Sequence, residues 1–265
     1  MGGGVGPPEE SGQQVKSGTR LIQEIDQTIT VTPTLWWLGH AGFVIRFANI
    51  TFYVDPYLTG PDTLADPAEI RHADMIFATH AHPRHMDAGT IVPMLAGSPR
   101  SKVVLPKSAS EAAHAAGIGY PRMTTTDNGL RVEYWKDNLY GRVYAVPSAH
   151  PGLDWTADGG YPYLGYLIRF GRWTVYHAGD CAPYENLADR LRPFNVSVAL
   201  LPVGGKNHSP IEAAQLASDI GARWVVPMHT TTTDVNAFVD HMLGQRPWQS
   251  FKTFEPGEKW TVPED

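Results

Sequence analysis

The chain has 265 residues, which is enough for one large α/β domain or two small ones with a substantial core. Its hydrophobic content of 42% and charged content of 18% are those of an ordinary globular protein, and a formal net charge of −6 argues against nucleic acid as a partner. A single cysteine excludes an internal disulfide framework and favours the cytoplasm, and no apolar run approaches the roughly 20 residues of a membrane-spanning helix.

The N-terminal stretch is rich in glycine and proline, so we expect residues 1–20 to form a flexible tail before a single domain over residues 21–265. The apolar pattern of the first half predicts, in chain order, a short helix at 21–26, two strands within 34–47 that turn at 39–42, a strand at 51–54, a buried strand at 75–78, a helix at 88–95, a strand at 103–105 and a helix at 110–116.

The second half of the chain has a similar succession of predicted strands and helices. Strands are expected near 131–135, 142–147, 163–169, 173–176, 197–202 and 223–227, and helices near 183–191, 210–220 and 234–243. Runs of strands followed by helices in each half predict an α/β fold with two sheets face to face and helices outside, a four-layer αββα sandwich. No linker rich in glycine, serine or proline interrupts residues 20–260, which favours one domain.

Three histidines, His80, His82 and His85, fall within six residues directly after the buried strand at 75–78. Imidazole is the commonest metal ligand among side chains, and loops at strand ends are common places for chemistry. The stretch therefore predicts a metal site.

Three more candidate ligands also follow predicted strands: His150, Asp180 and His229. Taken from the residues alone, the triplet of His80, His82 and His150 is typical of zinc with an open position for water. The remaining pair, His85 and His229, makes a second and poorer site, which Asp180 can bridge to the first.

The motif His-x-His-x-x-His at the end of a strand resembles the metallo-β-lactamase superfamily, whose usual motif is His-x-His-x-Asp-His. Further stretches over about 34–245 are similar to the UlaG-like branch, which contains the L-ascorbate-6-phosphate lactonases: Trp36-Trp37-Leu38-Gly39-His40-Ala41-Gly42, Asp55-Pro56, Tyr176-His177-Ala178-Gly179-Asp180 and Val225-Val226-Pro227-Met228-His229.

This resemblance implies a ligand set. The first metal would be held by His80, His82 and His150, and the second by His85 and His229, with Asp180 as the bridge. Asp55 looks like the carboxylate that orients a ligand histidine. For Thr79 and Asp87 the alternatives are similar buried hydrogen bonding or a purely structural role.

Arg84 stands where the superfamily has an aspartate ligand of the second metal. Arginine stays protonated and has no lone pair to offer, so it cannot replace that ligand. Arg84 could point away, could pair with Asp180 or Asp87 in place of a metal, or could grip a carboxylate or phosphate of the substrate with its bidentate fork. We favour a single tightly held metal over a binuclear site, and either over a metal-free relic.

Several residues could shape a pocket. His208 is either a general acid or replacement ligand, or a surface residue beside a helix N-terminus. Lys206 could contact an anionic substrate, with a solvated lysine as the alternative, and Trp155 could form a substrate wall or pack in the core. For His40 and His177 we favour buried hydrogen bonding over metal ligation, and for Cys181 a small buried residue over a thiol nucleophile.

The resulting prediction is a metal-dependent hydrolase of a small molecule, with a lactone or ester favoured and a phosphodiester next. Asp180 would be a bridging ligand or general base, and the cofactor one or two divalent ions, with zinc or manganese favoured and iron also open. The substrate could be anionic, and a homo-oligomer is open. The alternatives are an oxidative iron or manganese enzyme on the same fold and a degenerate, non-catalytic binding protein.

Overall fold

The computed structural model describes residues 15–264, including the backbone but not the side chain of Thr232. Most of the predicted tail, residues 1–14, lies outside the described residues. The first helix begins at Gly18 and so takes in three residues assigned to the tail, because Leu21, Ile22 and Ile25 bury its apolar face. No described helix is long and apolar enough to cross a membrane.

The helices lie near the predicted places. The α-helices are α1 (Gly18–Gln27), α2 (Ala88–Gly97), α3 (Ser110–Ala115), α4 (Leu187–Leu191), α5 (Pro210–Asp219) and α6 (Thr232–Gln245). Short 3₁₀ helices span Pro67–Glu69, Lys107–Ala109, Tyr120–Arg122 and Arg192–Phe194.

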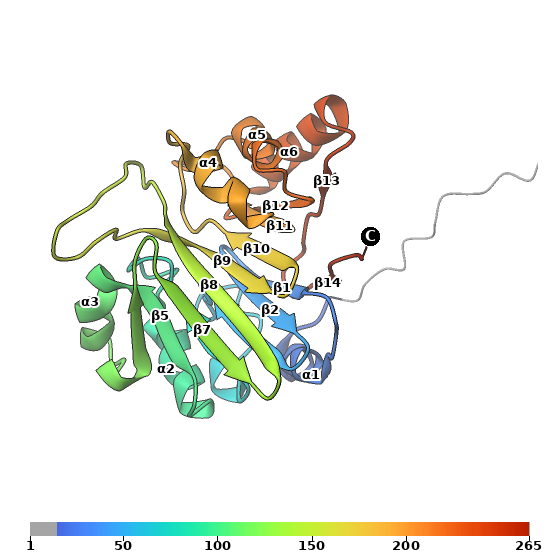
Figure 1. Cartoon of the computed structure of the whole chain (residues 1–265). Helices are drawn as coiled ribbons and strands as arrows, with labels where there is room; N and C mark the ends of the chain where they lie inside the picture. Colours follow the sequence, from blue (N-terminus) through green and yellow to red (C-terminus); the bar gives the residue numbers. More distant parts are fainter. Residues whose placement is uncertain (1–14, 265) are drawn as a thin grey trace, which may run out of the picture.

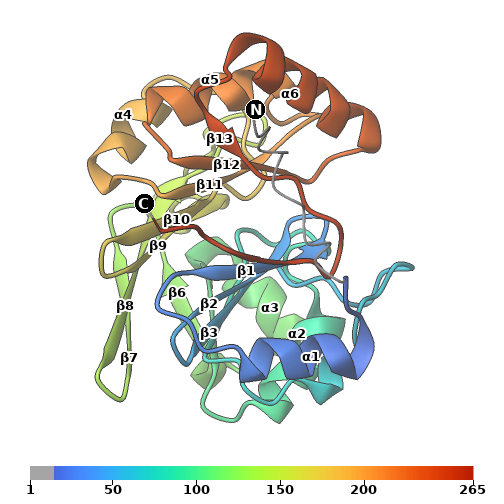
Figure 2. The ribbon, with the colours of Figure 1, turned by 90° about the vertical axis from the view of Figure 1, so that its right-hand side faces the viewer.

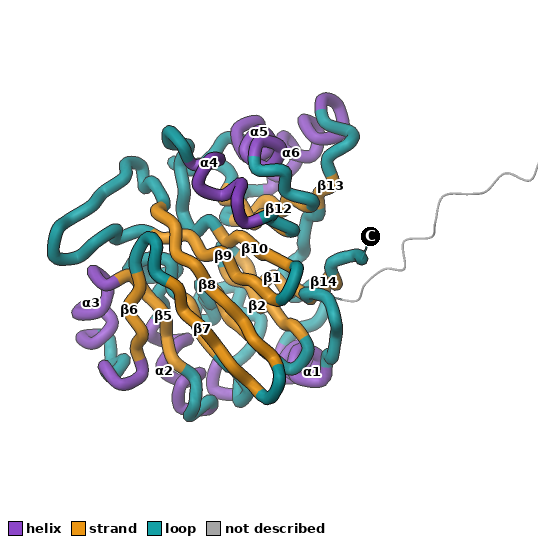
Figure 3. The backbone as a smooth tube through the Cα atoms, in the orientation of Figure 1, coloured by secondary structure: helices purple, strands orange, loops and turns teal. Residues whose placement is uncertain are grey.

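The strands form two seven-stranded mixed sheets (Figure 3). The first has the order β14 (Lys259–Thr261), β1 (Thr34–Gly39), β2 (Gly42–Phe47), β3 (Ile50–Val54), β4 (Met75–Phe77), β5 (Lys102–Pro106), β6 (Met123–Thr126). The second has the order β13 (Ser250–Phe251), β12 (Trp224–Met228), β11 (Val198–Pro202), β10 (Trp173–His177), β9 (Leu164–Phe170), β8 (Leu139–Pro147), β7 (Arg131–Lys136).

The predicted four-layer αββα arrangement is confirmed (Figures 1 and 2). Helices α1, α2 and α3 lie on the outer face of the first sheet, and α4, α5 and α6 on the outer face of the second. Alternation along β3 shows how one strand serves two layers: Phe52 and Val54 face the core between the sheets, whereas Tyr53 packs with the helices outside.

Aromatic side chains fill part of the space between the sheets. Phe52 of the first sheet lies with its ring centroid 5.3 Å from that of Phe170 in the second, and Phe47 stacks on the same Phe170 ring at 5.1 Å. Phe170 is fully buried. These contacts pack the two sheets against each other face to face.

Strand direction brings the candidate residues together. In the first sheet β3 and β4 are parallel, and β1 runs the same way because it is antiparallel to β2, which is antiparallel to β3. In the second sheet β8, β10 and β12 share one direction by the same reasoning. The carboxyl ends of these strands therefore meet at one edge of the sandwich, where loops can carry chemistry.

Three elements were not predicted from the sequence. The edge strands β6, β13 and β14 have four residues or fewer, and such short segments carry too little periodicity to be recognised. The helix expected at 183–191 is confined to Leu187–Leu191, since Asn186 adopts a left-handed backbone conformation just before it.

We expect Phe170→Ala to lower the free energy of unfolding by about 3–5 kcal/mol, because the cavity it leaves is closed off between the sheets. Chemical denaturation followed by circular dichroism measures this. The matched control Trp248→Ala removes a 72% exposed ring and should change stability by less than about 0.5 kcal/mol. Equal effects of the two substitutions would contradict the assigned packing.

Candidate metal centre

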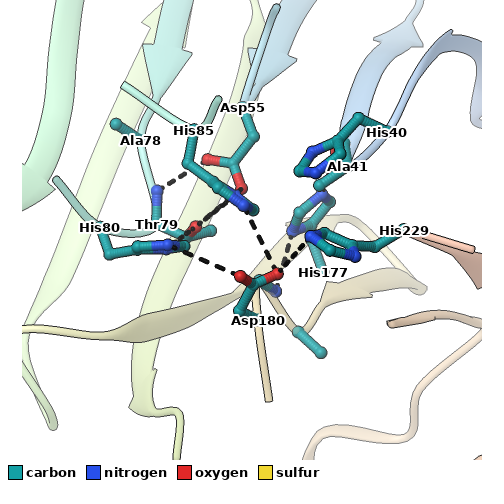
Figure 4. A network of polar contacts seen from close by, with 12 residues as sticks. His40, Ala41, Asp55, Ala78, Thr79, His80, His85, His177, Asp180 and His229 are labelled. Carbon is teal, nitrogen blue, oxygen red and sulfur yellow. Dashed lines mark hydrogen bonds and ion pairs between the residues drawn. The ribbon is translucent and has the colours of Figure 1, made fainter. Parts of the chain in front are cut away.

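The carboxylate of Asp180 lies at the centre of a group of histidines (Figure 4). Its Oδ2 is 3.2 Å from Nε2 of His150 and 3.8 Å from Nε2 of His80. Its Oδ1 is 3.3 Å from Nε2 of His229 and 3.4 Å from Nε2 of His85. Each carboxylate oxygen therefore faces a different pair of imidazole nitrogens, which is the arrangement of a bridging ligand.

The Oδ2 side holds the histidines expected at the first metal. The ring centroid of His82 lies 4.5 Å from that of His80 and 5.1 Å from that of His150. Donor atoms of His82, His150 and Asp180 all lie within 4.8 Å of one another. Tyr163 stacks on His150 with a centroid distance of 4.9 Å and an interplanar angle of 12°, and so forms an aromatic wall beside this group.

The Oδ1 side contains one histidine more than expected. Donor atoms of His40, His85 and His229 lie within 4.8 Å of one another, with the His40 ring 3.9 Å from His229 and 5.1 Å from His85 between centroids. The backbone N–H of His229 donates to the carbonyl of His40 at 3.0 Å, so the two loops are joined directly.

Asp55 fixes the direction of the ligand histidines that follow β4. This fully buried carboxylate accepts the backbone N–H of Thr79 at Oδ1 and the Thr79 hydroxyl at Oδ2, both at 2.7 Å. It also pairs with Nδ1 of His85 at 2.6 Å, which leaves Nε2 of that ring for another partner. The Thr79 oxygen contacts Nδ1 of His80 at 3.0 Å, again leaving Nε2 free. Such partners set the tautomer and orientation of metal-binding histidines.

The site is electrostatically coupled. Burial lowers the pKa of His85, but Asp55 and Asp180 outweigh burial and raise this pKa to about 9. Burial raises the pKa of Asp180, but His85, His229 and His80 hold it well below its usual range. Burial lowers the pKa of His80 far below its ordinary value. A metal ion at His85 has to displace a proton, whereas His80 is already neutral and able to bind.

The donor set fits a metal ion. Among the described residues, His80 Nε2, Asp180 Oδ1 and His40 Nδ1 are buried without a hydrogen-bond partner. Leaving a buried polar atom unsatisfied costs about 1–3 kcal/mol, and a divalent ion would remove that cost. Imidazole and carboxylate donors suit zinc, manganese or iron, so the donors do not choose among these metals.

Three of the seven described non-glycine residues with positive φ lie at this edge of the sandwich. The non-glycine residues His40, Asp55 and His229 have φ values of 50°, 46° and 53°. Gly179, at φ 63°, is required by space as well, since a Cβ there would lie 2.9 Å from Cβ of Thr79. Backbone of this kind persists where surrounding contacts impose it, and it gathers at functional sites.

A cavity of about 550 Å³ opens beside the Oδ1 side of the site. Its lining includes Tyr57, Arg84, His40, His229 and Thr231. The Arg84 side chain is exposed, and in the described part of the chain no hydrogen bond or ion pair joins it to Asp180 or Asp87. Of the three expectations for Arg84, pairing with Asp180 or Asp87 is therefore not seen among the described residues, and a role toward substrate stays a prediction.

Of the two alternatives expected for Asp87, its contacts are those of the structural one. Asp87 is the N-cap of α2, where it accepts the N–H of Gly89 and the hydroxyls of Thr59 and Thr90. None of these partners is a ligand histidine, so Asp87 anchors the helix after the metal-site loop and does not orient a ligand.

Three predicted pocket residues lie away from the metal-site cavity. His208 is 1% exposed, bonds to the backbone of Cys181, and lines a separate cavity of about 270 Å³ under α4 and α5. Its pKa is lowered to about 4 by burial. Lys206 is exposed on the loop before α5, and Trp155 is 58% exposed; neither lines the cavity with Arg84. The aromatic wall is Tyr163, which follows Trp155 in the same loop.

His177 and Cys181, the remaining candidates in or beside the sequence motifs, are buried structural residues. His177 is fully buried, with Nε2 donating to the carbonyl of Ala41 at 2.7 Å and Nδ1 accepting from the N–H of Gly179 at 3.2 Å (Figure 4). Cys181 is fully buried, and burial raises the pKa of its thiol to about 11, which argues against a nucleophilic thiolate.

From the sequence we favoured buried hydrogen bonding over metal ligation for His40, whereas the structure places it in a donor cluster with His85 and His229. The residue stands out in the sequence between Gly39 and Ala41, but the direction of its ring depends on a left-handed backbone that no local pattern reveals. Tyr57 in the cavity wall was missed, and it carries no signal beyond its place after Asp55 and Pro56.

Comparison with known proteins gives a consistent picture. A family model described as a β-lactamase superfamily domain matches residues 34–229. The chain is 32% identical over 206 residues to a protein of Myxococcus xanthus described as a UPF0173 metal-dependent hydrolase, covering 76% of this chain and 71% of that protein. A protein of Pyrococcus horikoshii with the same description is also 32% identical, over 203 residues, covering 74% of this chain and 84% of the relative.

Solved structures share the fold. Igni18, a metallo hydrolase from Ignicoccus hospitalis, superimposes with a TM-score of 0.70 and 22% identity, covering 88% of this chain and 100% of that protein. At this level of identity the likeness concerns the architecture of the sandwich.

We expect Asp55→Asn to weaken zinc binding by about 10- to 100-fold, the usual effect of losing the partner of a ligand histidine. Asp55 accepts three hydrogen bonds through two oxygens, whereas an asparagine has one oxygen and an NH₂ group, so at least one donor would face another donor. Competition with a fluorescent zinc chelator measures the affinity. The control Asp240→Asn alters an exposed carboxylate of α6 and should leave zinc affinity unchanged; unaltered affinity in Asp55→Asn would refute the assigned role.

Proposed function

The chain belongs to the metallo-β-lactamase superfamily, and from this premise we propose that it is a metal-dependent hydrolase acting on a small molecule that carries an anionic group. We favour a lactone or another carboxylic ester as the scissile group, with a phosphodiester next. This choice follows the resemblance of the sequence motifs to the lactonase-like branch.

The observation that carries the proposal is the position of Asp180. Its two oxygens face two pairs of imidazole nitrogens at 3.2–3.8 Å, and both His80 and His85 have their other ring nitrogen engaged by Thr79 or Asp55. Histidines that each keep one ring nitrogen unpaired, are oriented by a partner at the other nitrogen and surround one carboxylate form a donor set for a divalent ion. In this proposal His80, His82 and His150 hold an ion with Asp180.

A divalent ion held there supplies a nucleophilic water at neutral pH and polarises the scissile bond. Side chains of the protein would bind the ion, orient the reactants and bound the pocket. Asp180, kept ionised by its histidine neighbours, would hold the ion and could orient a water molecule by accepting a hydrogen bond from it. Tyr163 bounds the pocket beside His150 with its ring face.

Arg84 is proposed as the group that binds the anionic part of the substrate. Its guanidinium is exposed in the wall of the cavity beside His229, and it carries a fixed positive charge. A planar guanidinium fits a carboxylate or phosphate through two parallel hydrogen bonds. The arginine would therefore hold the charged end of the substrate while the ester group lies over Asp180.

Removal of metal should abolish hydrolysis. We expect the protein dialysed against a chelator to lose activity toward a panel of carboxylated lactones, neutral lactones and phosphodiesters, and to regain it with Zn²⁺ or Mn²⁺. Turnover is followed by product release in a pH-indicator assay, with the chelator-treated buffer as blank. Hydrolysis that survives complete metal removal would contradict the proposal, and so would turnover that needs oxygen and iron.

We expect Arg84→Ala to raise KM for carboxylated lactones by roughly 10- to 100-fold, since a hydrogen bond to a charged group contributes about 1.5–3 kcal/mol. Neutral lactones should be almost unaffected. Arg84→Lys should recover only part of the loss, because lysine keeps the charge without the planar fork. Steady-state kinetics measure both constants, with the exposed Arg190→Ala on α4 as control. Equal losses for charged and neutral lactones would mean that Arg84 acts on something other than the anionic group.

A further inference from the structure

We propose that His40 is a ligand of a second metal ion. It would replace the aspartate ligand of the superfamily, at whose sequence position this chain has Arg84. The second ion would be held by His40, His85 and His229 together with Oδ1 of Asp180. The inference rests on the proposed function in that both require a metal-loaded site, but it concerns how many ions this chain binds and through which residue.

The candidate donor atoms of the second site lie close to one another. One donor atom from each of His40, His85 and His229 lies within 4.8 Å of the others, and Oδ1 of Asp180 is 3.3–3.4 Å from two of these rings. Because zinc–nitrogen bonds are about 2.0–2.1 Å, two nitrogens on one ion are at most about 4.2 Å apart. Small rotations of the side chains around a common centre would bring all three within that limit.

One ring nitrogen of His40 is left without a hydrogen-bond partner. Its Nδ1 is buried and has no hydrogen-bond partner in the part of the chain that the structure describes. By contrast His177, the other histidine of the sequence motifs with no expected metal role, has both ring nitrogens hydrogen-bonded. Among the described residues His208 and His241 also have a buried ring nitrogen without a partner, but of these three only His40 has it within a cluster of other candidate ligands (Figure 4).

The backbone presents His40 at a fixed angle. The carbonyl of His40 accepts from Nε1 of Trp37 at 2.9 Å and from the N–H of His229 at 3.0 Å. The next residue, Ala41, is held by the ring of His177. These contacts impose a φ of 50° on His40, a conformation that costs about 1–3 kcal/mol outside glycine and that gathers at functional sites.

The resulting centre has two halves of the same composition. His80, His82 and His150 would share one ion with Oδ2 of Asp180, and His40, His85 and His229 would share the other with Oδ1. A neutral imidazole in place of an aspartate leaves the centre with more positive charge. Arg84 in the cavity wall adds to that charge, so the complete site would favour anionic substrates.

With His40 as a ligand, we propose two metal ions where the sequence favoured a single one. The replacement at Arg84 favours a single tightly held metal only if no other side chain offers a donor at that place. His40 comes from the loop between β1 and β2, more than 40 positions earlier in the chain, and therefore lies outside the motif in which the aspartate is absent.

The test is zinc stoichiometry without substrate. Untagged protein is stripped of metal, loaded with Zn²⁺, separated from free ion by gel filtration and measured by elemental analysis. We expect about two equivalents in the native chain and about one in His40→Asn, which removes the imidazole while asparagine tolerates the left-handed backbone. The double variant His40→Asn, Arg84→Asp should regain the second equivalent, because aspartate supplies the missing donor. His72→Asn, at a histidine outside the cluster, should match the native chain.

Several outcomes would overturn the proposal: one equivalent in the native chain, two equivalents bound with native affinity in His40→Asn, or one equivalent in the double variant. Recovery of the second equivalent in the double variant separates ligation from structural damage, because a misfolded site would not be repaired by a change at Arg84. Thermal melting of the metal-free proteins checks the fold independently. Since no substrate is present, two equivalents in an inactive native protein would sink the proposed function and leave this inference standing.

Discussion

The carboxylate of Asp180 is the contact on which the site depends, because it gathers candidate ligands from both sheets around two oxygen atoms. Asp180 comes from the end of β10 in the second sheet, whereas His80 and His85 come from the loop after β4 in the first. Direct hydrogen bonds keep the two edges in register: the hydroxyl of Tyr166 donates to the carbonyl of Ala78, and the N–H of His229 to that of His40. A shift of one sheet against the other would separate the donors.

Much of the fold and part of the site could be predicted from the sequence for one physical reason. Side chains such as Asp55 and His150 follow apolar runs, and the carboxyl ends of parallel strands lie at one edge of a sheet. The position of a residue after a predicted strand therefore predicts that it lies close to residues far away in the sequence. The four-layer sandwich followed from the same pattern. Which nitrogens are free could not be predicted, because that depends on the tautomer set by Thr79 and Asp55 across two strands.

Other features escaped because they depend on a single backbone angle or on tertiary contacts. The ring of His40 reaches the cluster through a left-handed φ, and the choice between the two alternatives for Asp87 depends on the hydroxyls of Thr59 and Thr90, which lie beside it in the fold. His208 follows a strand at the correct edge, as the ligands do, but its side chain turns under α5 instead of toward the cavity. Position at a strand end is therefore necessary for membership of the site and not sufficient.

The C-terminal strand has a consequence for how selectivity and chemistry are divided along the chain. The family model ends at residue 229, yet β14 pairs with β1, whose end carries His40, and the later residues Thr231 and Pro256 line the cavity. The candidate donors gathered around Asp180 all lie within the matched segment, whereas part of the cavity wall lies beyond it. Evolution could thus reshape what the cavity admits by altering the last 36 residues, without touching the residues that would hold the metal.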